Sequence, residues 1–146
     1  MINFVTLPLL GAPRRILGGS FNDFPGSAIG VCLEVRSRLA GLADVLIDVP
    51  DFAAPSQVML LEGLVRTLWL LRDAPDLPVY VGCAAGLGRT GTFIAALARL
   101  AGIDDGVAWV RVNYDLRAVE TVAQAAAVAA LDVDAVWAAY AGKAAL

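Results

Sequence analysis

The sequence predicts an α/β fold, in which one layered domain holds a central mixed sheet of about four to five strands flanked by helices. Three observations predict it. Short apolar runs with strand character come early in the chain, segments of helical periodicity alternate with them, and only helical segments follow residue 90. Because no repeat, low-complexity tract or long polar linker divides the chain, we expect a single domain over residues 1–146.

Four segments are expected to form the strands of this sheet. Residues 15–18 lead into a glycine-rich turn, and residues 30–35 alternate well enough for a strand, although a helix is also compatible there. Residues 44–49 are apolar and β-branched and end at Pro50, and residues 79–82 form a short buried run.

The helices follow from periodicity and from their end signals. Ser56 is a suitable N-cap for a helix whose apolar residues recur every three or four positions through about residue 72. A second helix begins at the hydroxyl residue Thr90 and stops at Gly102. Two or three further helices are expected at residues 105–112, 119–130 and 133–141.

Charge and hydropathy exclude several classes of protein. The formal net charge of −3 argues against a general nucleic-acid binder, and no apolar stretch reaches membrane-spanning length. The N-terminus lacks the basic start of a signal peptide and has Pro8 within its short apolar run. We therefore expect a cytoplasmic protein without nucleic-acid or membrane partners.

The chain contains no histidine and two cysteines, Cys32 and Cys83. The missing imidazole excludes Ser–His and Cys–His catalytic pairs and most zinc sites, so we expect neither a metal nor another cofactor. In a reducing cytoplasm two thiols are expected rather than a disulfide. Proton transfer must then be carried out by Asp, Glu, Cys, Tyr or Lys side chains.

One stretch, VYVGCAAGLGRT at residues 79–90, carries the chemical signal. It lies between a predicted strand and a predicted helix, where open α/β sheets bind ligands. Gly86 and Gly88 allow successive backbone N–H groups to converge on an anion, and the helix N-terminus adds further unpaired N–H groups. Arg89 supplies a planar fork for two phosphate oxygens. The positive charge of Arg89 and the positive end of the helix dipole also favour the thiolate form of Cys83. The stretch thus combines a nucleophile with an anion-binding loop.

Two other interpretations of this stretch fit less well. A Walker A loop aligned on residues 88–90 has Cys83 in place of its first glycine and Arg89 in place of its lysine. A buried structural cysteine beside a glycine turn leaves the spacing from Cys83 to Arg89 and the neighbouring glycines unexplained.

The residues Cys83, Gly86, Arg89, Thr90 and Gly91 form the pattern C-x-x-G-x-x-R-T-G, which resembles the signature loop of the cysteine-dependent protein tyrosine and dual-specificity phosphatases. The resemblance covers about residues 15–125 and is strong at residues 79–92. It implies that Cys83 forms a phosphocysteine intermediate and that Thr90 stabilises the thiolate as it leaves. It further implies that the equatorial phosphate oxygens are held by the backbone N–H groups and guanidinium of this P-loop, from Ala84, Ala85, Gly86, Leu87, Gly88 and Arg89.

The same resemblance implies a general acid on a loop upstream of the cysteine. The sequence VPDFAAPS, which follows the predicted strand at residues 44–49, is similar to the family's acid loop and places Asp51 32 residues before Cys83. Asp48 is the alternative. We expect Asp51 to be the acid, because a loop residue can close over a substrate whereas a strand residue cannot.

Two further positions bear on the resemblance. The segment AVETVAQ at residues 118–124 is similar to the family segment that ends in a water-positioning glutamine, here Gln124, and a polar position on an alanine-rich helix is an equal alternative. The family's histidine before the cysteine is replaced by Gly82. We therefore expect turnover to rise over a more alkaline range than in relatives that have the histidine.

These residues predict a phosphomonoesterase that acts on phosphotyrosine and, through a shallow pocket, on phosphoserine or phosphothreonine in proteins. The loop interior has no additional Lys or Arg, which disfavours highly charged phosphoinositides. One alternative is a phosphate-binding pseudophosphatase with little turnover, as the loss of the histidine suggests. Another is a cysteine redox or sulfur-transfer protein in which Cys32 would be the resolving thiol. The sequence leaves the oligomeric state open.

Overall fold

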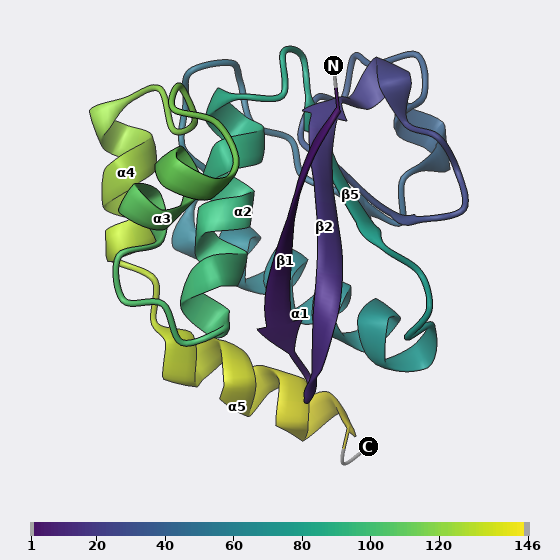
Figure 1. The fold of residues 1–146 in the computed structure, drawn as a ribbon, viewed down its shortest axis with the longest axis vertical. Helices are drawn as coiled ribbons and strands as arrows, with labels where there is room; N and C mark the ends of the chain where they lie inside the picture. Colours follow the sequence, from purple (N-terminus) through teal and green to yellow (C-terminus); the bar gives the residue numbers. More distant parts are fainter. Residues whose placement is uncertain (1, 145–146) are drawn as a thin grey trace.

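The strands form one mixed sheet in the computed structural model, which describes residues 2–144 (Figure 1). Its strands are β1 (Asn3–Leu9), β2 (Ala12–Ser20), β3 (Ile29–Cys32), β4 (Val45–Leu46) and β5 (Val79–Cys83). Their order across the sheet is β1-β2-β5-β3-β4. β1 pairs antiparallel with β2, and the other neighbours are parallel. The predicted fold class is confirmed, and β5 lies at the centre of the sheet.

The N-terminal strand β1 was missed by the sequence analysis, which treated this segment only as a poor signal peptide. Buried and exposed side chains alternate along it, which is the period of a strand. Leu10 and Gly11 form its turn to β2 with positive φ angles of 54° and 78°. Pro8 is tolerated because β1 is an edge strand.

β3 and β4 are shorter than the predicted segments at residues 30–35 and 44–49. The chain leaves the sheet after Cys32 and after Leu46. The residues beyond turn toward the cysteine loop, where the carbonyl groups of Leu33 and Val49 accept hydrogen bonds from Arg89. Because β3 and β4 end early, the backbone carbonyl groups that follow them are free to accept hydrogen bonds from Arg89.

The predicted helices are present with shifted ends. They are α1 (Gln57–Asp73), α2 (Gly88–Leu100), α3 (Gly106–Asn113), α4 (Val122–Ala129) and α5 (Val133–Ala144). Ser56 caps α1 as predicted, since its side chain accepts a hydrogen bond from the Met59 N–H at 3.1 Å. α2 begins at Gly88 rather than Thr90, and α4 begins after its cap Thr121 rather than at residue 119.

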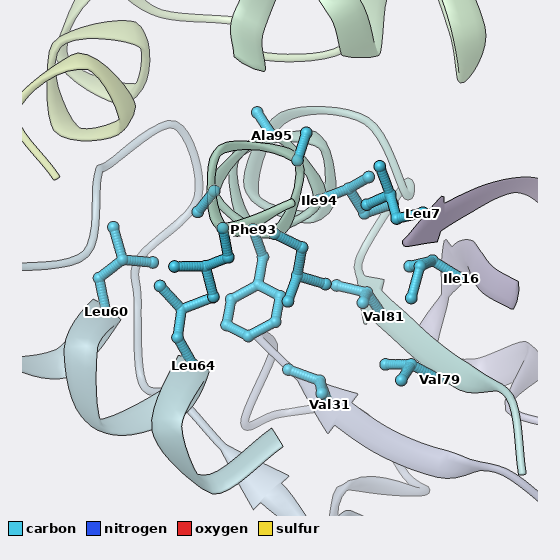
Figure 2. Close-up of a cluster of buried hydrophobic side chains, with 14 of the residues drawn as sticks. Leu7, Ile16, Val31, Leu60, Leu64, Val79, Val81, Phe93, Ile94 and Ala95 are labelled. Atoms are coloured by element: carbon cyan, nitrogen blue, oxygen red, sulfur yellow. The ribbon is translucent and has the colours of Figure 1, made fainter. Parts of the chain in front are cut away.

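α1 and α2 cover one face of the sheet with apolar side chains. Figure 2 shows the ring of Phe93 from α2 among Leu64 of α1 and Val31 and Val81 of the sheet, all of them buried. α3 and α4 pack on α2, and α5 packs along α1 (Figure 1). The opposite face carries a smaller cluster around Tyr80, beneath two 3₁₀ turns, η1 (Phe21–Asp23) and η2 (Ala40–Leu42).

No single helix among residues 2–144 is long and apolar enough to span a membrane. α4 and most of α5 reach that length only together, and they are bent by 61° at the break between them.

Candidate active site

Cys83 is the last residue of the central strand β5, and the chain runs from it directly into α2. Its side chain is buried at 4% exposure, whereas Ala84 and Ala85 at the top of the loop are exposed. The Gly86 N–H donates a hydrogen bond to the Cys83 Sγ at 3.2 Å. The sulfur therefore faces the loop, as the proposed nucleophile must.

The backbone N–H groups of the loop are left without acceptors. Within the described part of the chain, five of them donate to no protein atom, namely those of Ala84, Ala85, Leu87, Gly88 and Arg89. Leu87 is the N-cap of α2 and offers no side-chain acceptor to the first turn. Converging free amides at a helix N-terminus form an anion site.

Gly86 fixes the shape of the loop. It has a φ of +80°, and a Cβ there would lie 2.5 Å from the Gly19 Cα, so the loop sits directly on the end of β2. The Tyr114 hydroxyl donates a hydrogen bond to the Gly86 carbonyl at 2.7 Å. Because C=O and N–H of one trans peptide point in opposite directions, this bond turns the Leu87 N–H to the other side of the loop.

Tyr114 was not singled out by the sequence analysis. It is the C-cap of α3, and its ring fills the space beside Gly18, where no side chain would fit. Burial, together with the charge of the nearby Cys83, raises the pKa of Tyr114. Its hydroxyl thus remains a donor to the loop at neutral and moderately alkaline pH.

Arg89 is held in place by acceptors from two other segments. Its Nη1 donates to the carbonyl oxygens of Leu33 at 2.9 Å and Val49 at 2.7 Å, and its Nη2 donates to Glu34 Oε1 at 3.2 Å. The side chain is only 1% exposed, and its Nε has no partner in the described residues. A guanidinium has five N–H donors, so Nε–H and one Nη2–H make no hydrogen bond among the described residues. Neighbouring Nε–H and Nη2–H donors form the fork that binds two oxygens of a phosphate.

Glu34 is a functional residue that the sequence analysis missed. Its side chain is 12% exposed and forms the ion pair with Arg89. The backbone N–H of Arg36 and, to a smaller extent, the Arg89 guanidinium hold the pKa of Glu34 below its ordinary value. Its position near the carboxyl end of the strand predicted at residues 30–35 was the signal that could have found it.

Thr90 lies in the first turn of α2 and is fully buried. Its Oγ1 makes no hydrogen bond within the described residues. A buried hydroxyl without a partner costs free energy, so it calls for a functional explanation. Thr90 directly follows Arg89 in the chain.

Asp51 lies at the mouth of the site. Its Oδ1 is 3.7 Å from Arg89 Nη2, and it accepts a hydrogen bond from the Phe52 N–H at 2.9 Å. The side chain is 47% exposed and lines a hollow of about 320 Å³ together with Arg89 and Glu34. Asp48 lines the same hollow but has no ion pair with Arg89 among the described residues. The geometry favours Asp51 over Asp48.

Gln124 is fully buried in a capping box at the start of α4. Its Oε1 accepts hydrogen bonds from the N–H groups of Glu120 and Thr121 at 2.8 and 3.2 Å, and its Nε2 donates to the Ala53 carbonyl at 3.2 Å. The structure brings it to the acid loop rather than into the phosphate loop.

Gly82 replaces the family's histidine for a steric reason. A Cβ at this position would lie 2.8 Å from both the Cα and the N of Phe21, because η1 crosses β5 there. No side chain fits without moving the backbone of this turn.

Cys32 takes no part in the loop. It and Cys83 are both free thiols, and they belong to apolar clusters on opposite faces of the sheet. Cys32 donates a hydrogen bond to the Glu34 carbonyl at 3.1 Å, and burial raises the pKa of its thiol. Among residues 2–144, no group of three His, Cys, Asp or Glu side chains is placed to hold a metal ion.

Comparison with known proteins points to one family. A protein-family model described as "Polymorphic toxin system, DSP-PTPase phosphatase" matches residues 30–102, which include Asp51 and the whole cysteine loop. Tyrosine-protein phosphatase 3 of Schizosaccharomyces pombe is 41% identical over 69 residues, which are 45% of this chain. The match covers only 22% of that curated relative.

Solved structures share the fold. A protein tyrosine phosphatase, described as putative, from Leishmania major matches with a TM-score of 0.64 at 19% identity, covering 90% of this chain and 98% of that one. The active form of Tk-PTP matches with a TM-score of 0.59 at 24% identity, covering 84% of this chain and 92% of that one. At these identities the two structures establish the fold alone.

Proposed function

Because this chain belongs to the family of cysteine-dependent protein tyrosine and dual-specificity phosphatases, we propose that it hydrolyses phosphomonoesters through a phosphocysteine at Cys83. One observation carries the proposal. The guanidinium of Arg89 is buried and bonded through Nη1 and Nη2, yet its Nε has no partner among the described residues. Together with the free amides of the loop, this donor supports a binding site for a phosphoryl dianion.

In the first step the Cys83 thiolate attacks phosphorus, and the bond from phosphorus to the ester oxygen breaks. That oxygen takes the proton of the Asp51 carboxyl group and leaves as an alcohol or phenol. Arg89 and the loop amides hold the three equatorial oxygens as their charge grows. The products of this step are the phosphocysteine and the Asp51 carboxylate.

In the second step a water molecule attacks phosphorus and gives a proton to the Asp51 carboxylate. The bond from sulfur to phosphorus breaks, and its electron pair returns to Cys83. The Thr90 hydroxyl, which has no other partner among the described residues, would donate a hydrogen bond to this thiolate. Inorganic phosphate leaves, and both groups return to their starting protonation states.

The proposed substrates are phosphorylated proteins, with phosphotyrosine preferred. The exposed side chains of Phe52 in the acid loop and of Val122, beside the Thr121 that bonds to Phe52, offer apolar surface to an aromatic ring. The Glu120 carboxylate lies against Gly88 at the rim of the phosphate loop, where it would repel a second phosphate group.

The test compares turnover of p-nitrophenyl phosphate and of a phosphotyrosine peptide, with EDTA present, by the parent and three variants. We expect Cys83→Ser to lose all activity above background. We expect Asp51→Asn to lose about 10²–10⁴-fold in kcat on the peptide, which has the poorer leaving group. The matched control Asp48→Asn should stay near the parent.

Other outcomes select the alternatives. A parent that binds vanadate without turnover would be a phosphate-binding pseudophosphatase. Full activity in Cys83→Ser would exclude the phosphocysteine. Loss of activity in Asp48→Asn but not in Asp51→Asn would exchange the acid assignment.

A further inference from the structure

The segment at residues 118–124 packs directly against the phosphate loop and its helix. The Val119 N–H donates to the Leu87 carbonyl at 3.4 Å. A Cβ at Gly91 would lie 2.7 Å from the Ala118 Cβ and 2.9 Å from the Val119 nitrogen. We call residues 118–124 the bridge segment, because their other end contacts the acid loop.

On the acid-loop side, two side chains of the bridge segment hold consecutive carbonyl groups. The Thr121 Oγ1 donates to the Phe52 carbonyl at 3.2 Å, and the Gln124 Nε2 donates to the Ala53 carbonyl at 3.2 Å. Phe52 directly follows Asp51, and its N–H is bonded to the Asp51 carboxylate. The two bonds therefore restrain the backbone that carries the proposed acid.

Backbone strain lies on both sides of this contact. Phe52 and Val119 have positive φ angles of 64° and 63°, which are rare for aromatic and β-branched residues. Arg111 holds the strained turn by donating to the carbonyl groups of Ala118 at 3.0 Å and Val119 at 2.7 Å. Such conformations persist where the surroundings over-determine them, and they concentrate at functional sites.

We propose that Gln124 positions the general-acid loop and does not position the hydrolytic water, an inference that rests on the proposed phosphatase function. The side chain is fully buried, and both ends of its amide are bonded within the bridge segment or to Ala53. A group that orients water toward phosphorus has to face the phosphate loop. Gln124 instead fixes the distance between the Asp51 carboxylate and the Arg89 guanidinium by holding the acid-loop backbone in place.

The test exploits the dependence of acid catalysis on the leaving group. Loss of the acid slows release of a basic phenolate but hardly affects a good leaving group. We expect Gln124→Ala to lower kcat/KM, which reports only the steps through phosphocysteine formation, about tenfold on phenyl phosphate and less than about twofold on 2,4-dinitrophenyl phosphate, since a small misplacement of a catalytic group is costly. Thr121→Val should likewise lose more activity on phenyl phosphate than on 2,4-dinitrophenyl phosphate. Thr121→Ser, which keeps the hydroxyl, should retain the parent activity on both esters.

A double-mutant comparison identifies the group through which Gln124 acts. If Gln124 acts through Asp51, then Gln124→Ala in an Asp51→Asn background causes no further loss on phenyl phosphate. Losses that multiply in the double variant would overturn the inference, because Gln124 would then act independently of Asp51, as a water-positioning group does.

The matched control is Gln57→Ala. Gln57 also ties an element to α4, through its Nε2 bond to the Ala127 carbonyl at 3.0 Å, but among the described residues its side chain makes no hydrogen bond to Phe52 or Ala53 of the acid loop. Gln57→Ala should lose stability but should not lose more activity on phenyl phosphate than on 2,4-dinitrophenyl phosphate. An unequal loss as large as that of Gln124→Ala would overturn the inference. A failure of the proposed function is distinct, because the parent would then show no Cys83-dependent turnover of either ester.

Discussion

Arg89 carries a positive charge that is almost fully buried, and Glu34 is the carboxylate that offsets it. A buried charge without a partner is strongly unfavourable, whereas a paired and hydrogen-bonded one is tolerated. The carbonyl groups of Leu33 and Val49 complete the set of acceptors. Single residues from distant segments thus determine which donors of Arg89 stay free for phosphate.

We predict that Glu34→Gln destabilises the fold by about 1.5–3 kcal/mol, because a charged hydrogen bond to a buried guanidinium is lost. Inorganic phosphate should restore the stability of this variant more than it raises that of the parent, since the anion supplies the missing negative charge. Thermal unfolding with and without phosphate measures both effects. Glu62→Gln, an exposed position on α1, is the control, and equal phosphate responses in the Glu34→Gln variant and the parent would contradict the prediction.

At the scale of elements, the site depends on how closely β2, β5 and the turn η1 approach one another. Gly19 lies beneath the phosphate loop, and Phe21 lies against Gly82. At Gly82 and Gly86, β5 and its loop therefore pack directly against the backbone of Phe21 and Gly19. This close packing leaves no space at Gly82 for the histidine that the resemblance implies, and Tyr114 at the end of α3 anchors the loop instead.

We predict that Gly82→Ala destabilises the protein by about 1–3 kcal/mol, the usual cost of overpacking a tight contact. Gly82→His should be worse and should not raise activity. The matched control is Gly41→Ala, where a Cβ would have no neighbour within 4 Å. Urea unfolding measures the difference, and a Gly82→Ala variant as stable as Gly41→Ala would show that η1 moves away easily.

At the scale of the whole molecule, the sheet brings four separate segments to one edge. They are the ends of β3 and β5, the acid loop beyond β4, and the stretch from Tyr114 to Gln124. The helices α1 and α2 bury the main apolar cluster on one face (Figure 2), and Tyr80 lies in the smaller cluster on the other. Stability and site geometry therefore depend on the same buried groups.

Tyr80 makes the stability of the whole fold sensitive to alkaline pH. Burial raises its pKa from an ordinary value of 10.0 to about 12, and its hydroxyl donates to the Ser20 carbonyl at 2.7 Å. The unfolded chain ionises this phenol first, so its contribution to stability is full below about pH 10 and is lost as pH rises toward 12. We predict that Tyr80→Phe loses about 1 kcal/mol at pH 8 but falls less steeply than the parent above pH 10. Urea unfolding at pH 8 and at several pH values above 10 tests this. A free energy of unfolding that falls with pH equally steeply in Tyr80→Phe and in the parent would refute it.

Much of the fold could be predicted from local patterns. The alternation of strands and helices, the Ser56 cap and the strand–loop–helix setting of Cys83 are all properties of short segments, and the structure has them. β1 was missed because its alternating pattern becomes a strand only by pairing with β2. The ends of β3 and β4 were misplaced because tertiary contacts to Arg89 decide where those strands stop.

The sequence by itself determined the chemistry that is available: a cysteine and an arginine on a glycine-rich loop, an aspartate upstream, and no histidine. Only the tertiary structure decided which groups surround them. Glu34, Tyr114 and the acid-loop contacts of Gln124 join residues 55, 28 and 71 positions apart in the chain, and no local pattern encodes such pairs. The physical reason is that hydrogen bonds and close contacts at the site form between segments that meet only when the sheet and helices bury their apolar faces.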